Sequence, residues 1–222
     1  MGVFIDKQDR LLKIKDQIIN DPLLSEMSSH ATQLVFGSGN VDSDIVFIGE
    51  APGKKEDQTG RPFVGASGKF LDEMLRSIEI NRSNVYITNI VKYRLPGNRD
   101  PLPEEKAAFL PYLNMQLLTI RPRIIVTLGR HAASVFIPEV KISEDHGKLK
   151  TITISSQAGS LELLLLALYH PAAALYNGSK RDMLIKDFSL IANASFINKR
   201  IKSNHKTSNL ERSEIISNDR TK

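Results

Sequence analysis

The chain has 222 residues, of which 41% are hydrophobic, enough for one sizeable core and hardly enough for two. It contains no cysteine, which excludes disulfides, thiolate catalysis and any metal site ligated by sulfur. No run approaches the roughly 18 apolar residues of a membrane span, and the N-terminal MGVFIDKQDR lacks the apolar segment of a signal peptide. We therefore expect a soluble, intracellular protein, cytoplasmic in a prokaryote, without a membrane partner.

Positive charge is concentrated at the C-terminal end. The formal net charge is +5, and residues 199–222 hold seven Lys or Arg against three acids. The other 198 residues carry 23 basic and 22 acidic side chains, so a cationic groove there must come from arrangement rather than excess. Because residues 199–222 are polar with almost no apolar periodicity, we predict a basic, disordered tail after a single domain over residues 1–198.

Helical and strand-like segments alternate along the domain. Residues 6–20 place aliphatic side chains at helical spacing among charges and predict an amphipathic helix. Three short runs, DIVFIG, NVYITN and RIIVTL, are typical of strands buried on both faces; they cover residues 44–49, 84–89 and 123–128. Helices are predicted over 67–78, 103–120 and 181–196, and further strands over 150–154 and 163–169. This alternation favours an α/β fold with a parallel sheet between helices, whose ligand site lies beyond the carboxyl ends of the strands.

The loop after the first buried strand, GEAPG, continues into a segment rich in Gly and Pro. Such density imposes a fixed irregular backbone, which suits a pocket wall that approaches a flat ligand closely. Glu50 stands where open α/β sheets place ligands, which favours a catalytic or water-orienting carboxylate over a solvated loop acid. Phe63 either plugs the core or offers its ring face to a planar base.

The loop after the second strand begins at Asn89. Its carboxamide carries donors and an acceptor that match a nucleobase edge, although a helix or turn cap is the alternative. Three cations around it could contact phosphates or could simply be solvated, namely Lys92, Arg94 and Arg99.

The last informative loop, YHPAAAL, follows another apolar run and contains His170. A lone histidine is more often structural than catalytic. The small residues that precede Leu175 would form a compact loop able to enter a groove and hold the space of an extruded base. The alternative is the start of a helix with a buried leucine.

Four sequence blocks together resemble family 4 uracil-DNA glycosylases in order, spacing and content, over about residues 35–190: GEAPGKKEDQTGRPFVGASG, VYITNIVKYRLPGNRDPLPEE, RPRIIVTLGRHAA and YHPAAAL. The resemblance implies a three-layer α/β/α sandwich with a mainly parallel sheet. It also implies a monomer that hydrolyses the N-glycosidic bond of deoxyuridine in single- or double-stranded DNA, releasing uracil and leaving an abasic site. A catalytically weak module that binds uracil-containing DNA is the alternative.

The resemblance also assigns roles to the residues at matching positions. Phe63 would stack on uracil, Asn89 would read its polar edge, and His170 would donate toward its O2 atom. The site that orients or activates water would be lined by Glu50, Glu56 and the backbone near Ala51, with Asn98 completing the polar surround. Apart from the resemblance, charge and loop position lead us to expect that Lys92, Arg94, Arg99 and Leu175 contact DNA.

Two departures from the family pattern matter. Family 4 members typically bind an iron-sulfur cluster through four cysteines, and the matching positions here are Pro22, Ser25, Tyr93 and Phe109. We therefore predict no iron-sulfur cluster and no other cofactor or metal. A related branch links covalently to DNA through a histidine in an inserted basic loop, but residues 94–105, RLPGNRDPLPEE, contain neither insert nor histidine, so turnover is expected.

The absence of the cluster leads to a packing prediction. In the relatives the cluster ties the N-terminal segment to the loop after Asn89 and to the helix that follows. Without the cluster, these segments need other contacts to hold them together. We predict that Tyr93 and Phe109 pack against each other or against apolar neighbours such as Leu23, Leu24 and Met27.

Overall fold

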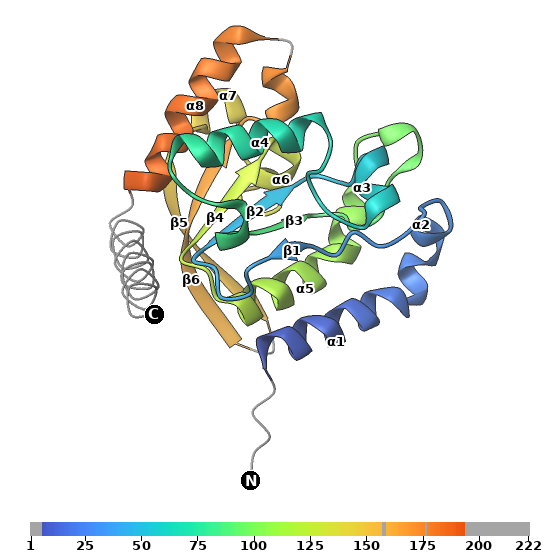
Figure 1. The fold of residues 1–222 in the computed structure, drawn as a ribbon. Coiled ribbons are helices and arrows are strands. Elements are labelled where there is room, and N and C mark those ends of the chain that lie inside the picture. Colours follow the sequence, from blue (N-terminus) through green and yellow to red (C-terminus); the bar gives the residue numbers. More distant parts are fainter. Residues whose placement is uncertain (1–5, 157–158, 176, 194–222) are drawn as a thin grey trace, which may run out of the picture.

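A computed structural model describes residues 6–156, 159–175 and 177–193, and in this part a six-stranded sheet lies between two layers of helices (Figure 1). The strand order is β1-β3-β2-β4-β6-β5. Strands β3, β2, β4 and β6 run parallel, whereas β1 and β5 pair antiparallel at the edges. The three-layer α/β/α fold with a mainly parallel sheet is thus confirmed. The strands are β1 (Ser38–Gly39), β2 (Ile45–Gly49), β3 (Tyr86–Asn89), β4 (Ile124–Leu128), β5 (Leu149–Ser156) and β6 (Gly159–Leu168).

The sheet is buried on both faces, and its central strands are mostly apolar. All residues of β2 and β4 are buried. Alternate residues of β2 face opposite sides, so Val46 and Ile48 belong to one core and Phe47 to the other. The first core is covered by α1 (Lys7–Ile19) and α5 (Pro103–Ile120), and the second by α4 (Ala66–Ser77) and α8 (Gly178–Asn193) (Figure 1).

Local sequence explains where the long helix α5 begins. Pro103 occupies its first turn, and the Glu105 carboxylate accepts a hydrogen bond of 2.8 Å from the backbone N–H of Leu102. The remaining helices are single turns in the loops: α2 (Ser25–Ser29), α3 (Lys54–Thr59), α6 (Arg130–Ser134), α7 (Ile142–Asp145), η1 (Pro22–Leu24), η2 (Arg82–Asn84), η3 (Pro96–Asn98) and η4 (Pro171–Ala174). None of the helices in the described ranges combines the length and apolar character that crossing a membrane requires.

Most predicted elements lie within three residues of the observed bounds, and the differences have physical causes. Strands β5 and β6 are longer than predicted because they form an antiparallel hairpin, with Ser156 paired to Gly159. Strand β1 has only two residues, too few for a detectable pattern. The closing helix α8 begins three residues early, while its predicted end at residue 196 and the predicted tail, residues 199–222, lie outside the described residues.

The predicted aromatic packing is confirmed for the ring pair. Tyr93 and Phe109 are buried, and their ring centroids lie 6.0 Å apart at an interplanar angle of 62°. Leu24 belongs to the same core, and Met27 packs against it, whereas Leu23 is 80% exposed and takes no part. Leu23 lies in the single turn η1, which turns only Leu24 inward.

Candidate active site

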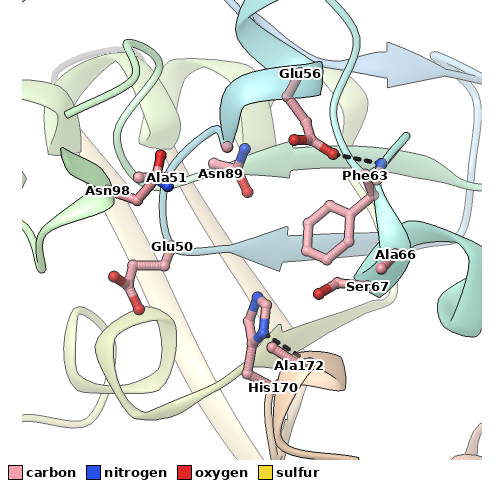
Figure 2. A pocket seen from close by; sticks show the side chains of 12 residues that line it. Glu50, Ala51, Glu56, Phe63, Ala66, Ser67, Asn89, Asn98, His170 and Ala172 are labelled. Atoms are coloured by element: carbon pink, nitrogen blue, oxygen red, sulfur yellow. Dashed lines mark hydrogen bonds between the residues drawn. The ribbon is translucent and has the colours of Figure 1, made fainter. Parts of the chain in front are cut away.

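The loops that follow β2, β3 and β6 surround a pocket of about 410 Å³ at the carboxyl ends of the parallel strands. This is the place where open α/β sheets bind ligands. The structure brings together all seven residues predicted to catalyse or to bind substrate: Glu50, Ala51, Glu56, Phe63, Asn89, Asn98 and His170. Figure 2 shows Phe63, Asn89 and His170 facing one space from different elements, with Glu50 at the edge opposite Phe63.

Phe63 is fixed by its loop. Its backbone adopts a left-handed φ of 52°, and the Glu56 carboxylate accepts hydrogen bonds of 2.8 Å from the next two N–H groups, those of Val64 and Gly65. Gly68 is required nearby, because a Cβ there would collide with the Phe63 carbonyl oxygen. The ring is 6% exposed, belongs to the second core and also lines the pocket. Phe63 is therefore both a core residue and a pocket wall.

Asn89 ends β3 and presents an unpaired polar atom. The residue is 2% exposed, and its side-chain Oδ1 atom is buried without a hydrogen-bond partner. A Cβ at Gly49, on the neighbouring strand, would collide with this oxygen and with the Phe63 ring. A buried, unpaired acceptor costs about 1 to 3 kcal/mol. This cost is recovered where a ligand brings an N–H donor to the oxygen.

His170 follows β6 and has a defined tautomer. Its Nδ1 atom accepts a hydrogen bond of 3.1 Å from the backbone N–H of Ala172, which leaves the proton of the neutral ring on Nε2 (Figure 2). Burial lowers the pKa of His170 to about 4. Its ring centroid lies 5.9 Å from that of Phe63. At neutral pH the pocket therefore contains an uncharged imidazole that can donate from Nε2.

The two acids of the pocket differ in their surroundings. Both oxygens of Glu56 lie beside the loop that it fixes, and one accepts the two N–H bonds. Glu50 is half-buried directly after β2, and within the described ranges its carboxylate accepts no hydrogen bond. Burial is the largest influence on Glu50 and raises the pKa of its carboxyl group. Glu50 is thus the acid that remains available to a substrate or water.

The structure corrects the prediction that Lys92 contacts DNA. Lys92 is fully buried, and its Nζ atom donates hydrogen bonds of 2.7 Å to the Thr88 hydroxyl and to the Asn89 carbonyl oxygen. Burial holds the pKa of this amine well below its ordinary value of 10.5. The amine cannot reach a phosphate from the core. Its apolar neighbours in the sequence, Ile90 and Val91, were a signal of burial.

The other residues predicted to contact DNA lie nearer the surface. The Arg94 Nε atom donates to Asn98 Oδ1 at 2.9 Å. Arg99 forms a bidentate pair with Glu105 at 2.8 and 2.6 Å, with 42% of the Arg99 side chain exposed. Leu175 directly follows η4, and its partly buried side chain packs against the second core. The small residues before it form a short 3-10 helix.

Sequence reasoning missed residues at the rim and beside Glu50. Ser67 lines the pocket from α4. Asp100 and His131 form a pair beside Glu50, and one ligand atom from each of these three residues lies within 4.8 Å of the others, close enough to surround a metal ion. The available signal was the RH pair that follows the apolar strand RIIVTL after a single glycine.

The positions that match the family's cluster ligands do not fit an iron-sulfur cluster. Pro22, Ser25, Tyr93 and Phe109 offer no thiolate. Two of these positions, Tyr93 and Phe109, hold buried aromatic rings that pack against each other. No step of the chemistry is therefore assigned to such a cluster.

Comparison with known proteins agrees with this geometry. Residues 36–193 match the family model described as the uracil DNA glycosylase superfamily. The chain is 41% identical to a Type-4 uracil-DNA glycosylase of Sulfurisphaera tokodaii over 86% of this chain and 88% of that protein. Proteins of the same name from Saccharolobus solfataricus and Archaeoglobus fulgidus are 44% and 46% identical, over 71% and 72% of this chain and 74% and 81% of theirs. The chain belongs to the uracil-DNA glycosylase superfamily.

Proposed function

We propose that this chain hydrolyses the N-glycosidic bond of deoxyuridine in DNA, releases free uracil and leaves an abasic site. Membership of the superfamily and relatives named Type-4 uracil-DNA glycosylase support this activity. The observation that carries it is the unpaired Asn89 oxygen beside the Phe63 ring and the His170 donor in one pocket. Because a duplex shields the bond, the nucleotide must rotate out of the stack before this pocket can hold its base.

Asn89 selects uracil in this proposal. Its Oδ1 atom accepts from the N3 hydrogen of uracil, and its amide nitrogen donates to O4. Cytosine reverses that pattern and would leave the buried oxygen without a donor. Sites built on such hydrogen bonds discriminate strongly, because the wrong ligand leaves buried polar groups unpaired. Phe63 supports the base by stacking.

His170 and Glu50 act on the reacting atoms. Negative charge develops on uracil O2 as the base departs, and the neutral His170 imidazole donates to it from Nε2. One preorganised donor of this kind contributes about 2.7 to 4 kcal/mol in comparable oxyanion sites. Glu50, beside the backbone of Ala51, orients water and accepts its proton as water attacks the sugar carbon. Glu56, which the sequence offered as a second candidate, instead holds the Phe63 loop.

Binding of the DNA strand is assigned to the rim. Arg94 and Asn98 form a linked pair at the pocket mouth, and the Arg99 side chain remains 42% exposed while it pairs with Glu105. Leu175 would hold the space left by the extruded base. We propose a monomer that acts on single- or double-stranded DNA without an iron-sulfur cluster, so the purified protein should be colourless and free of stoichiometric iron.

Release of labelled uracil tests the proposal directly. Oligonucleotides carry uracil opposite A, uracil opposite G, or uracil in a single strand, and matched substrates carry cytosine and thymine. We expect uracil release from at least one substrate, no release of cytosine, and a loss of about two to three orders of magnitude in Asn89→Ala with an unchanged melting temperature. Tight, uracil-specific binding without release would instead support the catalytically weak binding module.

A further inference from the structure

A hydrogen-bonded pair, His131 and Asp100, lies beside Glu50 without lining the pocket itself. His131 lies in α6, after β4, and Asp100 in the loop that leads to α5. The His131 Nε2 atom is 2.9 Å from Asp100 Oδ2, and 17% of the His131 side chain is exposed. Two loops thus bring a fixed imidazole to the one acid of the pocket that has no hydrogen-bond partner among the described residues.

These three side chains could be read as ligands of a divalent cation, but their neighbour argues against it. Arg130 Nη2 donates to the same Asp100 oxygen at 3.1 Å, and Arg130 Nε donates to His131 Nε2 at 3.2 Å. A guanidinium at hydrogen-bond distance from two of the three side chains repels a divalent cation. The His131–Asp100 pair is therefore better explained by its effect on Glu50.

Glu50 has opposing influences on its ionisation. Burial is the largest and raises the pKa of Glu50, and among the surrounding charges His131 lowers it most. Asp100 raises it, whereas Arg130 and Lys106 lower it. Glu56 and His170 face the same pocket from other loops. A carboxyl group that takes a proton from water must first be ionised, so the balance around Glu50 determines the pH range of activity.

We propose that His131, held in place by Asp100, is a positioning residue that keeps the Glu50 carboxylate ionised for the activation of water. This inference rests on the role of Glu50 in uracil excision proposed above. Asp100 anchors the imidazole beside Glu50, and Arg130 anchors Asp100 in turn. The arrangement holds His131 beside the Glu50 carboxylate, although neither His131 nor Asp100 lines the pocket.

The pH dependence of single-turnover uracil release tests the proposal. In wild type, the rate should rise on the acidic limb of the pH profile as Glu50 ionises. Glu50→Gln should abolish that limb and most of the rate. His131→Gln should move the acidic limb to higher pH by about one unit, which makes the rate at a given pH on that limb about tenfold lower. The rate on the alkaline plateau should change by only about threefold or less. His131→Lys, which places a positive charge at this position, should return the limb toward wild type.

Two controls separate this effect from general ones. His30→Gln removes an exposed histidine at the end of α2 and should leave the profile unchanged. Carboxyl ¹³C NMR follows the ionisation of Glu50 without turnover, its signal being identified by its loss in Glu50→Gln. His131→Gln should raise the pH at the midpoint of the Glu50 titration.

The outcomes distinguish this inference from the function on which it rests. Absence of uracil release from wild type at every pH would refute the proposed function. Release by wild type with the same Glu50 midpoint and the same acidic limb in His131→Gln would overturn the positioning role alone. A wild-type profile that changes with EDTA or added Zn²⁺ would also overturn it, in favour of a metal site.

Discussion

At the scale of single residues, Phe63 has a double role that can be separated by measurement. Its ring lines the pocket and is also part of the second core. Phe63→Ala should weaken binding of uracil-containing DNA relative to cytosine-containing DNA by about 1 to 3 kcal/mol, because base stacking is lost. It should also lower the melting temperature. Phe63→Leu is the control, because it keeps most of the core volume without the aromatic face. Equal uracil preference in all three proteins would refute the stacking role.

His170 gives a pH prediction whose sign follows from its environment. Burial holds its pKa near 4 in the folded protein, below the value of 6.5 expected in the unfolded chain. Between these values the unfolded chain binds more protons, so stability rises with pH and is lost on acidification. Between about pH 7 and pH 5, the melting temperature of wild type should fall more than that of His170→Gln. Parallel curves for the two proteins would contradict the burial of a neutral imidazole.

The sequence predicted which residues meet in the pocket better than it predicted what each one contacts. Glu50, Asn89 and His170 each follow a strand-like run, and parallel strands bring such positions to one edge. The hydrogen bonds of Glu56 to a loop eight and nine residues away depend on backbone geometry that no periodicity encodes. Lys92 was assigned to DNA from its charge, although the fold places it in the core.

At the scale of elements, the ring pair Tyr93 and Phe109 joins the loop after β3 to α5. Phe109 is fully buried, and truncating a buried Phe typically costs about 3 to 5 kcal/mol. Phe109→Ala should therefore lower the free energy of unfolding by about that amount in urea denaturation. Tyr93→Phe keeps both rings and should cost only about 1 kcal/mol. Equal effects of the two substitutions would show that the ring contact contributes little.

The elements themselves were predictable where their patterns were long. The buried strands and the amphipathic α1 follow from runs of apolar residues with clear period or length. The pairing of β1 with β3 through two residues, and the single-turn helices in the loops, depend on tertiary contacts instead.

At the scale of the whole molecule, most of the net charge lies outside the described fold. Residues 199–222 contribute four of the five net positive charges. Truncation after Asn198 should leave the melting transition unchanged and weaken DNA binding mainly at low salt, because Lys and Arg bind phosphates through release of counterions. Binding titrations over a series of salt concentrations measure this as a smaller slope. A collapsed melting transition would show that the segment is structural.

Lys92 links folding of the chain to the release of a proton. Its amine is buried with a pKa well below 10.5, whereas the unfolded chain exposes it to water. On the acid side of the ordinary lysine pKa the unfolded chain therefore binds more protons at this site than the folded chain, and unfolding takes up protons from the buffer. Calorimetric unfolding enthalpies of wild type should differ between buffers with small and large heats of ionisation, and Lys92→Met should reduce that difference. The same linkage makes the fold gain stability as the solution becomes mildly alkaline. An enthalpy difference unaltered by Lys92→Met would mean that the amine stays charged in the core.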